Sequence, residues 1–232
     1  MQFRQLYSGS AGNLYAVNGS AGKILIDPGV SIRKVKLALN FKLSTIDGAI
    51  ATHLHRDHCM ALPDIAKAGI NCYTLPSVAE SLKMTGHRLN IIDLAGVSSV
   101  EFNVGHYKCL AFPAEHDVPN MGLLISDGEE KLLYLCDSYY SKYTFKGLTQ
   151  IALGVNYAAE SLSSGMHGAR VRRLLTSHMS LENAIGLLKA NDLSKCKAIY
   201  LLHLSDANSD IELFKTSVHR ATGVPTHIIG CD

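Results

Sequence analysis

Short apolar runs bounded by turn residues recur along the chain and are typical of β-strands. The first three lie close together, separated by glycine-rich turns, and predict a hairpin or meander. A second strand-rich block follows near the middle of the chain. The predicted strands cover Phe3–Tyr7, Asn13–Val17, Lys23–Asp27, Gly48–Thr52, Ser98–Asn103, Tyr107–Phe112, Met121–Ser126, Lys131–Cys136, Ile151–Val155 and Ile199–Leu202.

Helical periodicity separates these strands. Ile32, Val35 and Leu39 recur at helical spacing over Ser31–Leu39. Further helices are predicted over Met60–Ala68, Ala169–Leu175, Leu181–Lys189 and Asp210–Ala221. Two strand-rich blocks, each followed by helices, indicate an α/β protein with two sheets packed face to face and helices outside. Neither an internal repeat nor a low-complexity linker divides the sequence, so we expect one domain over residues 1–232.

Composition narrows the class of protein. The 232 residues are 47% hydrophobic and 18% charged, which excludes intrinsic disorder. The net charge of +2 is too mild to indicate nucleic-acid binding, and does not exclude it. No apolar run approaches the ~20 residues of a membrane span, and the start lacks the pattern of a signal peptide. Six cysteines without a C-x-x-C pair are expected to be mostly buried thiols of a cytoplasmic protein, bacterial or phage-encoded, with no membrane partner.

The segment from His53 to His58 carries the strongest chemical signal. Three histidines and one aspartate follow directly after the strand predicted over Gly48–Thr52. On an extended strand end, His53 and His55 project to the same side, and a turn beginning at Arg56 can bring Asp57 and His58 to a second point. Imidazole and carboxylate together suit zinc, manganese or iron. The segment can therefore serve two adjacent metal ions.

These residues match the H-x-H-x-D-H signature, so the chain resembles the metallo-β-lactamase-fold hydrolases, an αββα sandwich of two mixed sheets. The resemblance implies two divalent metal ions, zinc or manganese, with Asp137 bridging them. Asp27, in Leu25–Gly29, resembles the supporting aspartate beyond the ligands, although an ordinary turn aspartate is the alternative interpretation. The implied metal ligands are His53, His55, Asp57, His58, His116, Asp137 and His203.

Motifs later in the chain indicate which branch of the metallo-β-lactamase-fold hydrolases it resembles. His178 in Thr176–Ala184, followed by His203, resembles the phosphodiesterase branch that includes tRNase Z. The narrower resemblance is to the YycJ/WalJ-like proteins, relatives of the RNase J group, and it extends through Ser8–Asn13 and Asn156–Leu162. The resemblance makes His178 the candidate proton donor to the leaving oxygen, with a helix-capping or packing role as the alternative.

Arg170 and Arg173 precede His178 and share one face of the predicted helix, where they can hold phosphates of a substrate. An ordinary solvated helix face is the alternative interpretation.

The resemblance implies a dinuclear metal-dependent phosphodiester hydrolase, with DNA a better candidate substrate than RNA and exonuclease action expected. A hydroxide shared by the two ions would attack phosphorus, steered by Asp57 or Asp137. A small-molecule phosphodiesterase acting on cyclic nucleotides is the main alternative. A lactonase or thioesterase and a non-enzymatic binder are the others, and the oligomeric state stays open.

Overall fold

The computed structural model describes residues 1–9, 12–20, 22–158, 175–202 and 211–228. Three of the predicted site residues, Arg170, Arg173 and His203, lie outside these ranges. Most of the helix predicted over Ala169–Leu175 lies outside them too.

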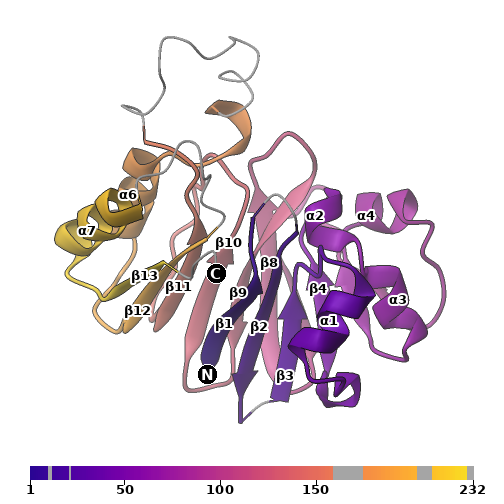
Figure 1. Ribbon diagram of the computed structural model, residues 1–232. Helices are drawn as coiled ribbons and strands as arrows, with labels where there is room; N and C mark the ends of the chain where they lie inside the picture. Colours follow the sequence, from indigo (N-terminus) through magenta and orange to yellow (C-terminus); the bar gives the residue numbers. More distant parts are fainter. Residues whose placement is uncertain (10–11, 21, 159–174, 203–210, 229–232) are drawn as a thin grey trace.

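The first sheet has six strands in sequence order (Figure 1). The first three form an antiparallel meander, as expected, and the following strands are parallel to the third. The strands are β1 (Gln2–Tyr7), β2 (Leu14–Gly19), β3 (Gly22–Ile26), β4 (Gly48–Ala51), β5 (Cys72–Thr74) and β6 (Leu89–Ile91). The connections hold α1 (Ile32–Ala38), a 3-10 helix η1 (Leu43–Thr45), α2 (Arg56–Cys59), α3 (Leu62–Lys67) and α4 (Pro76–Ser81).

The second sheet has seven strands in the order β13-β12-β11-β10-β9-β8-β7. Its first four strands along the chain are antiparallel, and the remaining strands run parallel to β10. The strands are β7 (Val100–Val104), β8 (Tyr107–Ala114), β9 (Asn120–Ser126), β10 (Lys131–Leu135), β11 (Gln150–Gly154), β12 (Ala198–Leu202) and β13 (Thr226–Ile228). The helices against it are α6 (Leu181–Ala190) and α7 (Ile211–Thr222). Both sheets are therefore mixed.

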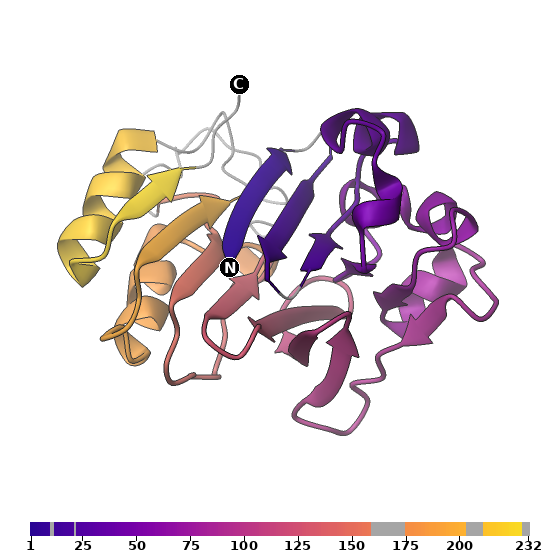
Figure 2. The same ribbon diagram turned by 90° about the horizontal axis from the view of Figure 1, so that it is seen from below.

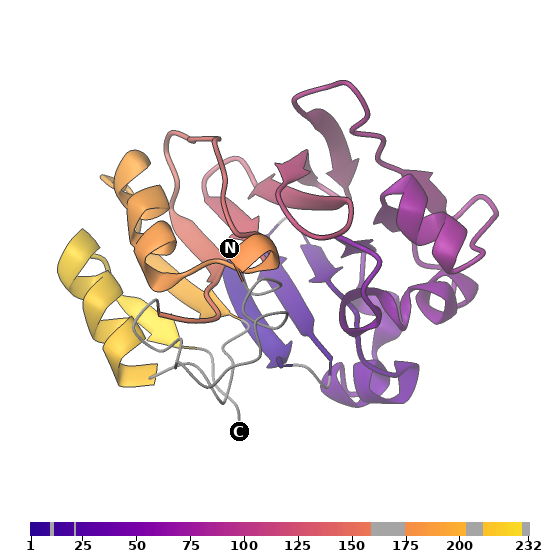
Figure 3. The ribbon, with the colours of Figure 1, turned by 90° about the horizontal axis from the view of Figure 1, so that it is seen from above.

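Side-chain alternation along the strands creates two cores. In β10, Leu132 and Tyr134 belong to the core between the sheets, whereas Leu133 and Leu135 belong to the core beneath α6 and α7. Across the inter-sheet core, Phe3 of β1 lies 5.2 Å from the ring of Tyr200 in β12, centroid to centroid. The views from below and above show α6 and α7 on one side of the sheets and the helices α1 to α4 on the other (Figures 2 and 3). The predicted α/β class and face-to-face sheets are confirmed.

The sequence pattern did not predict several short elements. β5, β6 and β13 have three residues each, too few to show alternation, and each is recognisable only from its pairing to a neighbouring strand. Among the described residues no helix has the length and apolar character to cross a membrane. The single domain over residues 1–232 stays a prediction.

Candidate metal centre

The carboxyl ends of four strands meet at one edge of the sandwich. Asp27 follows β3, His53 comes soon after β4, His116 after β8 and Asp137 after β10. Polar side chains gather at such ends because the strands point there in parallel and the chain then turns away. An isolated bridge between His53 and Asn120 joins this edge of the first sheet to the second.

His53, His55, His116 and Asp137 form the first cluster. Their ligand-type atoms all lie within 4.8 Å of one another. Nδ1 of His55 is 3.2 Å from Nε2 of His53 and 3.3 Å from Nε2 of His116. Oδ2 of Asp137 is 3.7 Å from Nε2 of His53. The sequence-predicted residues around the first ion are therefore brought together.

Asp57 and His58 reach the same carboxylate from the other side. Nε2 of His58 lies 3.0 Å from Oδ2 of Asp137 and 3.6 Å from Oδ2 of Asp57. Both residues sit in α2, where the chain turns directly after His55. Gly29 makes this turn possible, because a Cβ built there would lie 1.6 Å from the carbonyl oxygen of Asp57. Asp137 thus lies between the two predicted groups of ligands.

Three histidines are fixed so that Nε2 faces the cluster. His58 Nδ1 is 2.9 Å from Oδ2 of Asp27, and His116 Nδ1 is 2.7 Å from the carbonyl of Ser177. His53 Nδ1 is 3.1 Å from the Thr52 hydroxyl, whose own proton is directed to Asp27. Each Nδ1–H therefore has an oxygen acceptor, which leaves Nε2 for the centre. Ligand histidines in metal sites are commonly held in this way by an acceptor on the other ring nitrogen.

Asp27 supports the centre from beneath. The residue is fully buried, and its carboxylate accepts the Thr52 backbone N–H at 2.8 Å and the Tyr134 hydroxyl at 2.6 Å in addition to the His58 contact. These donors stabilise a buried carboxylate that would otherwise be costly. The structure therefore places Asp27 against His58, the position that the resemblance implies, rather than in an isolated turn.

The histidines of the first cluster and His58 differ in the direction of their pKa shifts. Burial, helped by the neighbouring His58, lowers the pKa of His53 well below its ordinary value. Burial likewise lowers the pKa of His116. Neutral imidazole is the form that binds metal. Burial opposes charge on His58 too, but Asp137 and Asp27 on either side raise its pKa well above the ordinary value. A proton on His58 or a bound metal ion can balance the negative charge of Asp137 and Asp27.

The donor set fits divalent metal ions. Imidazole nitrogens and carboxylate oxygens are the ligands that zinc and manganese accept. Because His55 Nδ1 can donate to only one of its two neighbours, nitrogen lone pairs converge in the first cluster, and a cation relieves that repulsion. Cys136 also lies beside His58 and Asp137. Burial and the carboxylates of Asp137 and Asp27 raise the pKa of its thiol well above the ordinary value.

His178 lies at the rim of the centre. Its Nδ1 is 3.6 Å from Oδ1 of Asp137, and its side chain is 20% exposed. The segment that carries it is held next to β11, because Asn156 N–H donates to the carbonyl of Met179 and Leu181 N–H to that of Tyr157. Two of the three predicted catalytic residues, His178 and Asp137, are therefore adjacent.

Sequence reasoning missed two polar residues of the centre. Asn13 donates from Nδ2 toward Nε2 of His58 at 3.0 Å, and its orientation is set by the Tyr15 hydroxyl on its oxygen. Asp117 Oδ1 lies 3.2 Å from Nε2 of His116 and 3.4 Å from Nε2 of His55. Position next to His116 was the available signal for Asp117; nothing in the local pattern marked Asn13 as part of the centre.

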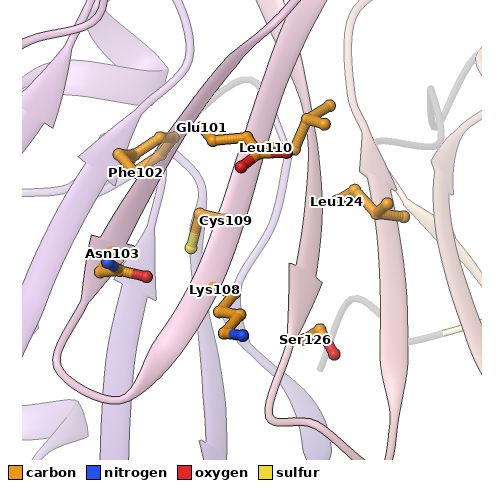
Figure 4. Close-up of a pocket in the computed structure, with 8 residues that line it drawn as sticks. All are labelled: Glu101, Phe102, Asn103, Lys108, Cys109, Leu110, Leu124 and Ser126. Atoms are coloured by element: carbon orange, nitrogen blue, oxygen red, sulfur yellow. The ribbon is translucent and has the colours of Figure 1, made fainter.

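A hollow on the second sheet shares no residue with the centre. It measures about 500 Å³ and lies along the strands β7, β8 and β9, where Glu101, Lys108 and Leu124 are among its lining residues (Figure 4). The hollow therefore gives no information about the chemistry of the histidine cluster.

Comparison with known proteins agrees with this geometry. Exodeoxyribonuclease YycJ of Bacillus anthracis is 26% identical over 235 residues, covering 94% of this chain and 88% of the relative. Exodeoxyribonuclease WalJ of Streptococcus pneumoniae is 27% identical over 225 residues, covering 90% of this chain and 83% of the relative. The predicted resemblance to YycJ/WalJ-like proteins is confirmed at this level of identity.

Solved structures show the same fold. The metallo-β-lactamase fold protein YhfI of Bacillus subtilis superposes with a TM-score of 0.74 at 15% identity, covering 97% of this chain and 95% of that one. The short form of human tRNase Z superposes with a TM-score of 0.66 at 14% identity, covering 89% of this chain and 93% of that one. Residues 23–203 match the model of the beta-lactamase superfamily domain. The chain therefore belongs to the beta-lactamase superfamily and is a metal-dependent hydrolase of the metallo-β-lactamase fold.

Proposed function

We propose that this protein is a nuclease that hydrolyses phosphodiester bonds of DNA from a strand end. The observation that carries the proposal is the position of Asp137 between His58 on one side and the cluster of His53, His55 and His116 on the other. The exodeoxyribonuclease names of the relatives in Bacillus anthracis and Streptococcus pneumoniae supply the substrate class. Cytoplasmic nucleic acid would be the natural substrate.

Two divalent metal ions, zinc or manganese, would occupy the centre. His53, His55, His116 and Asp137 would hold the first. Asp57, His58 and Asp137 would hold the second, together with His203, which the described ranges do not include. When bound, the metals lower the pKa of a water molecule and neutralise charge on the phosphate.

The surrounding side chains would each have a separate role in hydrolysis. Asp57 is 29% exposed and can accept a hydrogen bond from the attacking water, whereas the buried Asp137 carboxylate cannot reach far into solvent. His178, at the exposed rim beside Asp137, is placed to give a proton to the leaving oxygen. Asp27 holds His58 in position from beneath. Arg170 and Arg173 stay predicted phosphate contacts outside the described part of the chain.

The first prediction tests the shared carboxylate. Replacement Asp137→Ala should lower hydrolysis by about 100-fold or more, because it removes a ligand from both groups. Manganese- or zinc-loaded protein would be incubated with end-labelled single- and double-stranded DNA, and release of mononucleotides measured. Metal content would be measured on the same preparations, with two ions expected in the unmodified protein and fewer in the variant.

Asp64→Ala is the matched control, because Asp64 is a half-exposed aspartate on α3 whose ion-pair partner among the described residues is Lys67, at 3.7 Å. It should keep both metal content and activity. Unchanged turnover in Asp137→Ala would contradict the shared-ligand role. Intact DNA alongside hydrolysed cyclic nucleotides would favour the small-molecule phosphodiesterase, and hydrolysed lactones or thioesters alone would exclude phosphodiester chemistry.

A further inference from the structure

Positive charge is concentrated at the start of the chain. Residues 1–46 contain six basic residues and a single acidic one, Asp27, although the whole protein carries a net charge of only +2. Asp27 is fully buried in the metal centre, so it does not offset the basic residues at the surface. The basic residues are Arg4, Lys23, Arg33, Lys34, Lys36 and Lys42.

Three of these basic residues line one groove. Phe3 points into the inter-sheet core, so Arg4 projects from the opposite, outer face of β1. Lys23, paired with Asn18 across β2 and β3, lines the same groove. Lys42, which follows the end of α1, also lines this groove. The groove measures about 180 Å³ and is lined mainly by β1, β2, β3 and the segment from α1 to η1.

An exposed aromatic ring stands next to this groove. Phe41 is 70% exposed and directly precedes Lys42. Its φ of +60° and the φ of +48° at Asn40 are left-handed, a conformation that non-glycine residues adopt at a cost in free energy. The turn is fixed by hydrogen bonds from Phe41 N–H to the Lys36 carbonyl and from Lys42 N–H to the Leu39 carbonyl. The chain thus holds an apolar ring in solvent among lysines.

The basic face continues toward the metal centre. β1 runs parallel to β3, so Tyr7 at the end of β1 lies at the same edge as Asp27. There the Lys34 ammonium lies 5.3 Å from the centroid of the Tyr7 ring. Figure 1 shows β1 and β2 at the front with α1 beside them and no labelled helix across them. Positive side chains therefore extend from the groove to the edge that carries the centre.

Neighbouring acidic groups offset only part of this charge. Asp47 accepts the backbone N–H of Lys23 at 2.6 Å, and because that donor is neutral the carboxylate keeps its charge beside Lys23. Glu130 pairs with the ammonium of Lys197 at 2.8 Å and with the amino group of Met1. The charge of Glu130 is therefore balanced by two amino groups, and that of Asp47 offsets Lys23 rather than Arg4 or Lys42.

We propose that this basic face binds the backbone of a single DNA strand whose end lies in the metal centre, and that Phe41 stacks on an unpaired base of that strand. This inference rests on the proposed nuclease function, which makes DNA the ligand. Lysine and arginine bind phosphates without regard to sequence, and an exposed aromatic ring stacks on any unpaired base. A groove of positive charge with one stacking ring is the combination that single strands require.

The test is the salt dependence of binding to a fluorescein-labelled phosphorothioate oligothymidylate, which resists hydrolysis. Replacing Arg4→Gln and Lys42→Gln together should make the slope of log affinity against log sodium chloride concentration shallower by about 1.4, because two phosphate contacts are lost. Phe41→Ala should weaken binding about fivefold or more, and Phe41→Tyr should restore it. Lys108→Gln, an exposed lysine on β8 of the other sheet, is the matched control and should bind as the unmodified protein does.

Hydrolysis of bis(p-nitrophenyl) phosphate by the unmodified protein, which needs only the metal centre, separates the two proposals. If this ester and DNA both stay intact while the double variant still has the shallower slope, the nuclease function fails and the binding face stands. If the protein hydrolyses DNA but the double variant keeps the original slope, the binding face is wrong and the function stands. Unchanged DNA binding by Phe41→Ala together with a loss of self-association in sedimentation would instead identify Phe41 as a contact between copies of the chain, and would overturn the proposal.

Discussion

Asp27 and Asp137 are both held in an uncommon backbone conformation. Their φ angles are +49° and +48°, and each follows the end of a parallel strand, β3 in one sheet and β10 in the other. Aspartate tolerates the left-handed region better than most residues, but the conformation still costs free energy. Surrounding hydrogen bonds offset this cost, including the bonds from Thr52 and Tyr134 to Asp27. The two buried carboxylates therefore approach His58 from opposite sides.

Gly29 gives the first prediction at the scale of a single residue. Gly29→Ala should lower the free energy of unfolding by about 1–3 kcal/mol, because the new Cβ would overlap the Asp57 carbonyl and displace the turn that carries Asp57 and His58. Urea denaturation measures the loss, and metal content should fall with it.

Gly186→Ala is the matched control in the same chain. A Cβ at Gly186 in α6 would meet nothing within 4 Å, so alanine should raise the free energy of unfolding by about 0.5–1 kcal/mol. Equal effects of the two substitutions would refute the close-packing argument for Gly29.

At the scale of elements, the position of His178 depends on α6 and β11. Ser180 begins α6 by accepting the Asn183 backbone N–H at 3.1 Å, and it also bridges to Tyr157 just after β11. Ser177, in the preceding turn, accepts the Nδ1–H of His116. The segment from Ser177 to Ser180, which carries His178, is therefore bonded to α6, to the end of β11 and to His116 of the first cluster.

Removal of this helix cap should affect catalysis as well as stability. Ser180→Ala should lower the free energy of unfolding by about 1 kcal/mol, because one backbone N–H loses its acceptor. It should also lower kcat for DNA hydrolysis, whose leaving oxygen needs a proton, since His178 is two residues away. Ser31→Ala removes the corresponding bond from Ser31 to Lys34 N–H at 3.4 Å in α1 and should leave kcat unchanged. A kcat that falls equally in both variants would argue against a positioning role for Ser180.

Elements with a full pattern could be predicted, and very short ones could not. α1 shows three apolar residues at helical spacing, and β10 is an apolar run after its first lysine, so both were predicted. β5 and β6 were missed because a three-residue strand contains no repeat of the pattern. Pairing to β4, a property of the folded chain, defines β5 and thereby places β6.

At the scale of the whole molecule, the centre is assembled from residues far apart in sequence. The cluster around His53–His58 was predictable because its ligand-type residues fall within six positions, and His116 and Asp137 because the resemblance to the metallo-β-lactamase-fold hydrolases implies them. Asn13 and Tyr134 were not, since their roles arise only when the start of β2 and the strand β10 bring them next to His58 and Asp27. Which of the clustered residues hold metal, and how many ions they hold, stay predictions that metal analysis can test.

Packing between the sheets should hold this assembly together, and Phe3 tests that idea. Phe3 is 3% exposed and stacks on Tyr15 at 5.6 Å while contacting Tyr134 and Tyr200 of the opposite sheet. Phe3→Ala should lower the free energy of unfolding by about 3–5 kcal/mol, because it leaves a cavity between the sheets. Phe41→Ala, the same substitution at a ring that is 70% exposed, should change the free energy of unfolding by no more than about 0.5 kcal/mol. Urea denaturation followed by tyrosine fluorescence measures both, and a loss of similar size in the two variants would show that stability does not depend on the packing between the sheets.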